Sequence, residues 1–384
     1  MPYIVVKAPP RYHQVSVDEF LFEDEARTSY VALCETETIT RFRDYIPGNV
    51  RDAYNIPLAI RALQSFNETH SELFEPDRAS LYHTFYIPKR SGGGVRRIDQ
   101  PLPELMNALY ELRRIFESMF HADMLYHTTA HAYIHKRSTV TLVRKHQQNA
   151  SKWFAHYDFH NFFGSVTPEF LSKMFSMIYP FSAVMQSAGG KAVLEKALSL
   201  CFLNGGLPQG TPISPMLTNI LMIPFDHKFS NHLEAFGEQN YVYTRYADDI
   251  SISSRSPFDY KKVEAEIAAS LKTMEASLEL NRKKTSYGNN TGSNWMFGMM
   301  LNSKNNITVG WKNVKAFRST LNTYLYERSQ GRFWPLEQVR SLSGTISYYK
   351  MIDEQWLNSI LDIYNQKYKT SVRYCLKQDQ KRKQ

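Results

Sequence analysis

The sequence has few cysteines and no long apolar run. Only three of its 384 residues are cysteine, and Cys34, Cys201 and Cys375 stand far apart. An odd number of isolated cysteines excludes a disulfide framework and a cysteine-rich zinc cluster. No stretch reaches the roughly 18–20 uncharged apolar residues that a membrane helix needs, and the first residues carry no apolar signal core. We therefore expect a cytoplasmic protein that contacts no membrane.

Charge of one sign gathers at each end of the chain. Residues 1–80 carry 8 Lys and Arg against 13 Asp and Glu, a net of −5. Residues 312–384 carry 14 Lys and Arg against 6 Asp and Glu, a net of +8. Aromatic residues are interleaved with the basic ones, a pattern that suits a polyanion such as nucleic acid. A basic helical face is, however, often only a solvated surface.

The apolar periodicity predicts an α+β chain with a helical tail. We expect helices over most of 15–80, a hairpin over 81–101, a helix from 103, a strand and turn over 152–166, helix–loop–helix over 190–225, strand–turn–strand over 239–254, a helix over 258–280, short strands over 284–310, and helices after 311 with breaks at 331–335 and about 353. With 43% hydrophobic residues, the chain can bury a sizeable core.

Three aspartates carry the clearest chemical signal. Asp248 and Asp249 lie between two strand-forming runs in YTRYADDISIS, so a tight turn would let both carboxylates project together. An ordinary solvated turn is the alternative, because Asp favours turns. Asp158 ends the apolar strand WFAHYD. Three carboxylates form a hard oxygen site suited to Mg²⁺, and two such ions would activate a 3′-hydroxyl and neutralise a leaving pyrophosphate.

A glycine- and proline-rich loop precedes an apolar helix in NGGLPQGTPISPMLTN, residues 204–219. Its glycines permit close approach of the backbone, its prolines stiffen the loop, and Gln209 supplies a neutral amide. This loop, the YADD turn, and the aspartate strand ahead of FF together resemble the palm of bacterial reverse transcriptases in order and spacing. The resemblance covers about residues 80–310 and, more loosely, the rest.

The resemblance implies an RNA-directed DNA polymerase with an α+β, right-hand fold. Such a fold has an antiparallel palm sheet and a helical thumb. The implied domains are an acidic, mostly helical N-terminal extension over residues 1–80, fingers over 81–150, palm with part of the fingers over 151–310, and a basic helical thumb and tail over 311–384.

The resemblance also implies roles for single residues. Asp158 and Asp248 would ligate two Mg²⁺ ions, with Mn²⁺ as a substitute, and Asp249 would complete the acidic cluster. The resemblance also places Phe159 among the residues that would hold the metal ions. Phe163 would lie under the sugar and exclude a 2′-hydroxyl, because a rigid ring leaves that oxygen neither room nor a hydrogen bond. A simple core phenylalanine is the alternative.

Nucleotide-binding positions would surround the aspartates. Gln209 and Gly210 would lie against the incoming nucleotide and the template base. Lys89 and Arg96 lie seven positions apart on the two arms of a glycine-tipped turn and would close on the triphosphate. The planar fork of arginine can hold two phosphate oxygens.

Two further segments resemble family motifs downstream. In NRKKT, Lys284 would assist the pyrophosphate leaving group, with Lys283 as the alternative. In WMFGMML, Gly298 would let the primer backbone approach, and the basic helices beyond it would hold a duplex by its phosphates.

The segment AHAYIHKRSTVTLVRKH, residues 130–146, resembles retron and group II intron enzymes. The chain keeps His146 but lacks the Asn-Ala that retrons usually carry before it, and Met296-Phe297-Gly298 replaces their usual Val-Thr-Gly. These departures weaken a strict retron assignment, so the resemblance implies either a retron or a related defence-associated reverse transcriptase. Its partners would be a non-coding RNA template, an RNA/DNA duplex and deoxynucleoside triphosphates; a second copy or an effector protein stays open. The alternatives are a template-independent or protein-primed DNA polymerase and a catalytically inactive RNA-binding scaffold.

Overall fold

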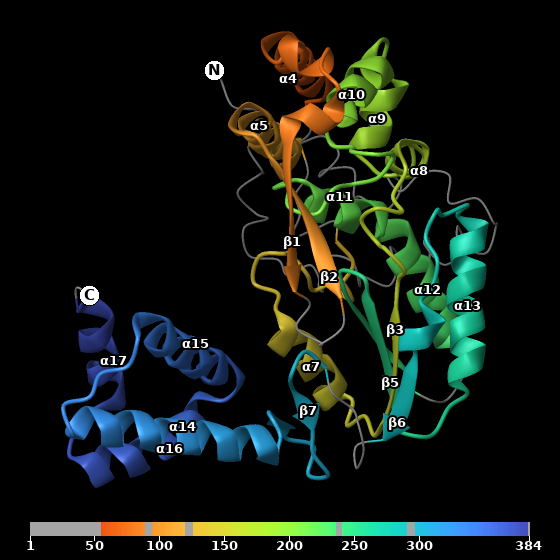
Figure 1. Cartoon of the computed structure of the whole chain (residues 1–384). Coiled ribbons are helices and arrows are strands. Elements are labelled where there is room, and N and C mark those ends of the chain that lie inside the picture. The colour runs from red at the N-terminus through yellow and green to blue at the C-terminus, as the bar shows by residue number, and fades with distance from the viewer. Residues whose placement is uncertain (1–54, 89–93, 120–125, 236–239, 290–295, 383–384) are drawn as a thin grey trace. The chain divides into compact units, whose positions relative to one another are not determined.

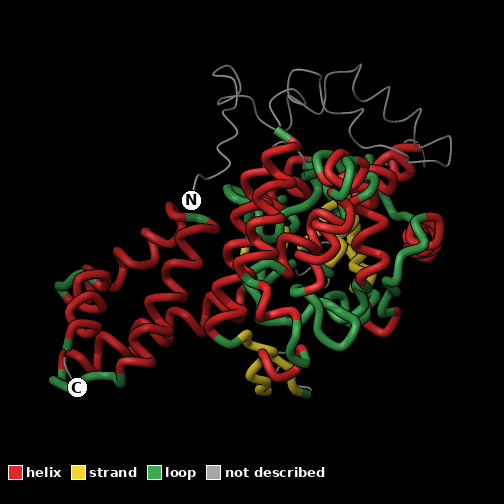
Figure 2. Tube along the Cα trace, turned by 90° about the horizontal axis from the view of Figure 1, so that it is seen from above, coloured by secondary structure: helices red, strands yellow, loops and turns green. Residues whose placement is uncertain are grey.

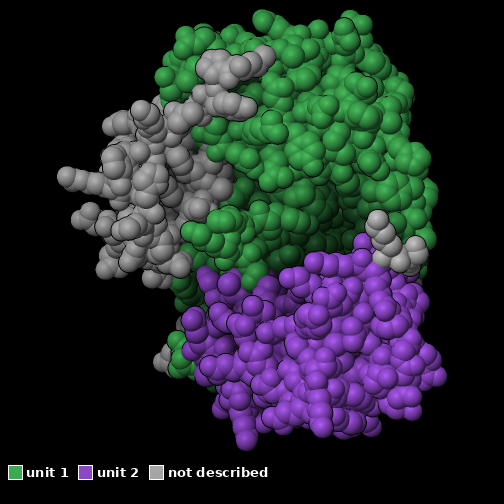
Figure 3. Space-filling model, turned by 90° about the vertical axis from the view of Figure 1, so that its left-hand side faces the viewer, with its two compact units in different colours: residues 1–138, 153–287 green, residues 139–152, 288–384 purple. Residues whose placement is uncertain are grey.

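A computed structural model describes residues 55–88, 94–119, 126–235, 240–289 and 296–382 (Figure 1). Helices make up most of these residues, with short strands between them (Figure 2). The chain divides into two compact units, one of residues 1–138 with 153–287 and the other of residues 139–152 with 288–384 (Figure 3). Each unit has its own buried apolar residues. The four predicted domains stay a prediction.

A four-stranded sheet forms the centre of the first unit, with the strand order β4-β5-β3-β6. The strands are β3 (Trp153–Asp158), β4 (Val242–Tyr246), β5 (Asp249–Ser254) and β6 (Ser286–Asn289). β5 pairs antiparallel with both β3 and β4, as the predicted strand–turn–strand requires. Successive side chains alternate between the two faces, so Ala155 and Tyr157 join the apolar core while Asp158 projects from the other face.

Helices supply most of the remaining core of the first unit. They are α4 (Ile56–Thr69), α5 (Pro103–Met119), α8 (Pro168–Phe175), α9 (Phe181–Gln186), α10 (Gly190–Ser199), α11 (Ser214–Leu221), α12 (Ile223–Ala235) and α13 (Tyr260–Thr273). The Asn55 side chain caps α4 by accepting from the Leu58 amide at 2.9 Å, and α5 begins at Pro103 as predicted. Among its described residues, the unit also has the short 3₁₀ helices η3 (Ser71–Phe74), η4 (Arg78–Leu81) and η5 (Arg282–Lys284).

The predicted hairpin is present as β1 (Tyr82–Pro88) and β2 (Val95–Pro101), which pair antiparallel from Tyr82 opposite Pro101 to Pro88 opposite Val95. Its tip, including Lys89, lies outside the described residues, as do residues 15–54 of the predicted N-terminal helices. One prediction needs correction: the helix expected over 258–280 ends at Thr273, and Glu275 just after it takes a left-handed φ of 51°. Three helices, α8, α9 and one over residues 139–148, were not predicted.

The second unit is mainly helical. It holds α7 (Thr139–Gln148), the strand pair β7 (Met300–Leu301) and β8 (Ile307–Thr308), and the helices α14 (Trp311–Ser329), α15 (Leu336–Ile352), α16 (Glu354–Tyr368) and α17 (Val372–Lys381). Both predicted breaks occur, and Asp353 caps α16 by accepting from the Trp356 amide at 2.9 Å. A third break at Lys369, whose φ is 49°, was missed. Of the helices in the described ranges, none combines the length and apolar character needed to span a bilayer.

Candidate active site

Three strand ends bring the predicted aspartates to one edge of the sheet. Asp249 is the first residue of β5 and pairs directly with Asp158, the last residue of β3. Asp248 lies in the β4–β5 turn, where Ala247 has a φ of 56°. Asp158 is 7% exposed, and the other two carboxylates are half-buried. The turn therefore places both adjacent aspartates beside the third one.

Main-chain bonds fix this edge. The Phe159 amide donates to the Asp248 carbonyl at 3.2 Å, and the Asn281 amide donates to the Asp158 carbonyl at 2.7 Å. The Lys284 ammonium lies 2.9 Å from each carboxylate oxygen of Asp158. Lys284 itself stays 61% exposed. Of the two candidate lysines in NRKKT, the structure thus brings Lys284 to the acidic cluster.

Burial and mutual repulsion set the charge state of the cluster. Burial, followed by the charges of Asp248 and Asp158, raises the pKa of Asp249 to about 7. Burial also raises the pKa of Asp248, the Asp158 charge adds to this effect, and the charges of Lys284 and Arg96 oppose it. The hydrogen bond to Asp158 is the largest cause of the raised pKa of Lys284. So much negative charge at one edge favours a bound cation.

The donor set suits a divalent ion, because carboxylate oxygens are the hard ligands that Mg²⁺ prefers. Within the described ranges, no three His, Cys, Asp or Glu side chains converge as a finished metal shell. The ammonium of Lys284 lies against the Asp158 carboxylate instead. The Phe159 ring is 2% exposed and stacks on Phe162 with centroids 5.5 Å apart. Only the main-chain carbonyl of Phe159 could therefore coordinate a metal ion.

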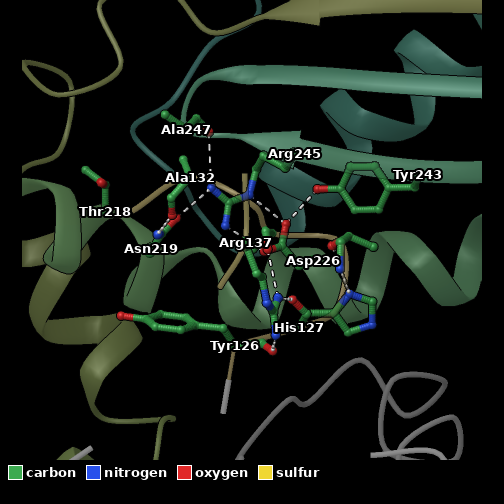
Figure 4. A network of polar contacts seen from close by, with 12 residues as sticks. Tyr126, His127, Ala132, Arg137, Thr218, Asn219, Asp226, Tyr243, Arg245 and Ala247 are labelled. Atoms are coloured by element: carbon green, nitrogen blue, oxygen red, sulfur yellow. Dashed lines mark hydrogen bonds and ion pairs between the residues drawn. The ribbon is translucent and has the colours of Figure 1, made fainter. Parts of the chain in front are cut away.

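A buried ion pair supports the β4–β5 turn from the core side (Figure 4). Arg245 on β4 donates to both carboxylate oxygens of Asp226 on α12, at 2.8 and 2.7 Å, and both side chains are fully buried. A third donor of Arg245 reaches the Ala247 carbonyl at 3.1 Å. The Tyr243 hydroxyl donates to Asp226 at 2.6 Å. The residue preceding Asp248 is thus held from the core.

The same arginine connects the turn to the loop over residues 126–138. The Arg245 amide donates to the Thr129 carbonyl at 2.8 Å, and the His131 amide donates to the Arg245 carbonyl at 2.8 Å. The side-chain amide of Asn219 on α11 donates to the Ala132 carbonyl at 2.5 Å. Arg245 and Asp226 were not predicted from the sequence. The available signal was a charged residue inside an apolar strand and another inside an apolar helix.

The glycine-rich loop over residues 204–219 bonds to the hairpin and to the turn after β3. The Asp99 amide on β2 donates to the Gln209 carbonyl at 2.8 Å, and the Leu207 amide donates to the Phe163 carbonyl at 3.0 Å. Gly210 has a φ of 120°, and a Cβ there would lie 2.9 Å from the Asp99 carbonyl oxygen. Only glycine fits this close approach. The Gln209 side chain is half-buried.

Two other predicted positions lie at this end of the first unit. Phe163 is half-buried, and its ring meets Phe162 edge to face, with centroids 5.6 Å apart. Arg96 is exposed on β2 opposite Ile87, and its charge lowers the pKa of Asp248. Lys89, which was predicted to bind the triphosphate, lies outside the described residues.

The predicted primer-grip turn belongs to the second unit. Met296 and Met299 bond to each other across it, at 2.7 and 2.9 Å. Phe297 and Gly298 have φ values of 52° and 81°. The Tyr348 hydroxyl on α15 donates to the Phe297 carbonyl at 2.8 Å, which holds the turn against this helix.

Several known proteins resemble the chain. The retron Ec73 reverse transcriptase of Escherichia coli is 25% identical over 73% of this chain and 85% of its own length. The retron Ec83 enzyme of E. coli is 24% identical over 75% and 88%. The retron Mx65 enzyme of Myxococcus xanthus is 26% identical over 86% and 77%.

Two solved telomerase structures are similar in parts. Apo telomerase from Candida tropicalis, truncated from its C-terminal domain, aligns with a TM-score of 0.44 at 14% identity; 64% of this chain is covered, and the chain spans 59% of that structure. Telomerase from Candida albicans with a fragment of telomeric RNA aligns with a TM-score of 0.43 at 13% identity, over 84% of this chain and 68% of that one.

The family model described as reverse transcriptase (RNA-dependent DNA polymerase) matches residues 87–315, more than half of the chain. This match, the antiparallel sheet and the helical C-terminal unit confirm the predicted α+β fold of the right-hand polymerase class. Divalent metal ions are general cofactors of this class of enzyme. The chain belongs to the reverse transcriptase (RNA-dependent DNA polymerase) family.

Proposed function

We propose that Asp158, Asp248 and Asp249 are the catalytic carboxylates of this polymerase and that they hold two Mg²⁺ ions, which Mn²⁺ can replace. The observation that carries the proposal is the direct pairing of Asp158 with Asp249 across neighbouring strand ends, with Asp248 in the adjoining turn. When bound, the ions activate the attacking 3′-hydroxyl and stabilise the charge on the leaving pyrophosphate.

Cationic residues complete the chemistry. Lys284 is protonated and exposed beside Asp158, so its ammonium can move from that carboxylate to the leaving pyrophosphate. Arg96, with Lys89 from the other arm of the hairpin, binds the triphosphate oxygens. Arg245 does not touch the substrate; it fixes the carbonyl that precedes Asp248. The protein thus orients groups that carry charge before the reaction begins.

The nucleotide site selects deoxynucleotides. Phe163 lies in the turn after β3, and the loop with Gln209 and Gly210 is bonded to that turn and to the hairpin. We assign Phe163 to the sugar and Gln209 with Gly210 to the base pair being formed. Replacing Phe163 by alanine should admit ribonucleotides, which competition between labelled dNTPs and rNTPs measures. Unchanged sugar selection in a folded Phe163→Ala enzyme would contradict this assignment.

The template is a partner non-coding RNA. This proposal is supported by relatives that carry retron names and match most of the chain. A cytoplasmic complex of enzyme, RNA and complementary DNA would then act in antiphage defence. The basic segment over residues 311–384 holds the RNA/DNA duplex as a thumb, and residues 81–150 and 151–310 act as fingers and palm.

The test is to express the gene with its native flanking DNA and sequence the nucleic acids that co-purify. The wild type is compared with the double variant Asp248→Asn/Asp249→Asn, which keeps the side-chain shapes but removes two charges. Asp362→Asn, on the exposed face of α16, is the control. We expect one RNA in all three preparations and complementary DNA only in the wild type and the control.

Three results would contradict the proposal. DNA in the double variant would exclude these carboxylates. DNA unrelated to the RNA would favour the template-independent or protein-primed alternative. RNA without DNA in every sample, even after Mg²⁺ and dNTPs are added, would favour the inactive RNA-binding scaffold.

A further inference from the structure

Tyr133 combines two features that are costly for a tyrosine. Its side chain is 55% exposed, although a large aromatic ring gains free energy by burial. Its backbone has a φ of 59°, in the left-handed region that non-glycine residues rarely occupy. Neither feature helps the fold, and residues held in such conformations cluster at functional sites.

The loop that carries Tyr133 is firmly held. The Arg137 guanidinium donates to the carbonyls of His127 and Ala130 at 2.6 and 2.7 Å. The Asn219 side chain donates to the Ala132 carbonyl at 2.5 Å, next to Tyr133 itself. Hydrogen bonds to the carbonyls of three residues that precede Tyr133 therefore hold this loop, and with it the left-handed conformation that presents the ring.

That place is beside the catalytic turn. The ring centroid of Tyr133 lies 6.4 Å from that of Tyr246, with the planes tilted by 42°. Tyr246 is the last residue of β4 and pairs with Asp249. The pKa of Tyr133 is raised by burial and by the nearby charge of Asp248, whereas Arg96 lowers it. The two tyrosines thus flank the carboxylates from the loop and from β4.

The chemistry of this pair fits a base or a sugar. Phosphates are bound by cations, and the triphosphate already has Arg96. A neutral exposed ring offers a face on which a base can stack, whatever its sequence. The positions assigned to the incoming nucleotide belong to β2, the turn after β3 and the loop over residues 204–219. Tyr133 and Tyr246 come from two other segments. They are therefore available to contact the primer, the strand that the enzyme extends.

We propose that Tyr133, beside the ring of Tyr246, forms an aromatic contact for the terminal base pair of the primer–template duplex and is a binding residue of the polymerase. The inference rests on the proposed function of the aspartates, since a primer end matters only at a polymerising site. The ligand is the end of an RNA/DNA duplex, bound through ring stacking.

The decisive variant is Tyr133→Asn, because asparagine tolerates the left-handed region better than tyrosine does. A residue that only supports the fold would lower the melting temperature when replaced; this change should keep or raise it. We expect the Kd for a labelled RNA/DNA primer–template to rise about tenfold, consistent with one lost stack. The KM for dNTP should stay within about twofold, and Tyr133→Phe should bind like the wild type.

Lys136 provides a matched control in the same loop, since it is also exposed and has a φ of 61°. Lys136→Asn relieves the same backbone strain but removes a charge and no ring. Any loss of binding in Lys136→Asn should shrink as salt rises, because phosphate contacts depend on salt. The loss in Tyr133→Asn should be similar at low and high salt.

Three outcomes would overturn the inference. An unchanged Kd for primer–template in Tyr133→Asn would show that Tyr133 does not contact the duplex. An equal loss in Tyr133→Phe assigns it to the hydroxyl and not to stacking. A raised KM for dNTP with an unchanged Kd for primer–template places Tyr133 at the incoming nucleotide. In each case the wild type still extends the primer; failure of the wild type to bind or extend any primer–template would instead refute the proposed function.

Discussion

Two ion pairs are connected to the β4–β5 turn and the aspartate strand beside it, and they differ in burial and in the number of their hydrogen bonds. Arg245 and Asp226 are both fully buried and joined by two short parallel hydrogen bonds. The Lys284 side chain is 61% exposed, although that of its partner Asp158 is almost buried. Removing either partner of the first pair would leave an uncompensated charge in the core, whereas Lys284 can exchange its partner for solvent or substrate.

The difference indicates two separate tasks. The donors of Arg245 bond to both carboxylate oxygens of Asp226 and to the Ala247 carbonyl, so the buried pair holds the turn in one arrangement. The exposed pair has a long, mobile cation whose charge is needed where the reaction develops negative charge. Arg245 supports the turn from the core, and Lys284 offers a charge that can change partners. A site needs both if its carboxylates keep their positions while substrates bind and leave.

Breaking the buried pair should have the largest effect. Arg245→Met leaves Asp226 charged and unpaired in the core, so we expect the free energy of unfolding to fall by about 3–5 kcal/mol. Denaturant titration measures this loss. Adding Asp226→Leu should restore much of the stability, because a well-packed apolar pair can replace a buried ion pair.

The double variant separates stability from positioning. The Ala247 carbonyl still lacks its donor, so polymerase activity should stay low and the Mg²⁺ concentration for half-maximal activity should rise. Arg328→Met in the second unit is the control: it breaks an ion pair to the buried Asp379, so it should lower stability without changing the Mg²⁺ dependence. Full activity in the restabilised double variant would show that Arg245 has no positioning role.

Removing the exchangeable charge should have the next largest effect. Lys284→Met takes away one cation that can stabilise the charge on the leaving pyrophosphate, and such a loss typically costs a factor of about 10² in kcat. Stability should change by less than about 1 kcal/mol, since an exposed salt bridge contributes little. Single-turnover nucleotide addition and thermal melting measure the two quantities. Lys283→Met is the matched control, because Lys283 is exposed next to it on the same 3₁₀ helix; equal losses in both variants would contradict the assignment.

The sequence predicts the exposed features of the site better than its buried support. The hairpins and the aspartate turn were predicted because turn residues and strand-forming runs are adjacent in the chain. Lys284 was singled out by its motif. Arg245 and Asp226 were missed, since they lie 19 positions apart and meet only when β4 packs on α12. The left-handed φ of Tyr133 was also missed, because tertiary hydrogen bonds impose it and its own residue type opposes it.

The smallest effect should come from trimming the buried network without breaking its ion pair. Tyr243→Phe removes the hydroxyl that donates to Asp226 at 2.6 Å but keeps the ring, which packs edge to face on Phe229 with centroids 5.0 Å apart. We expect the free energy of unfolding to fall by about 1.5–3 kcal/mol, the usual result of losing one hydrogen bond to a charged group. Activity per folded molecule should be unchanged, because both bonds from Arg245 to Asp226 and the bond to the Ala247 carbonyl remain. Denaturant titration and active-site-normalised rates test this together. A loss of activity as large as that of Arg245→Met would mean that the whole network, and not the arginine, positions the catalytic turn.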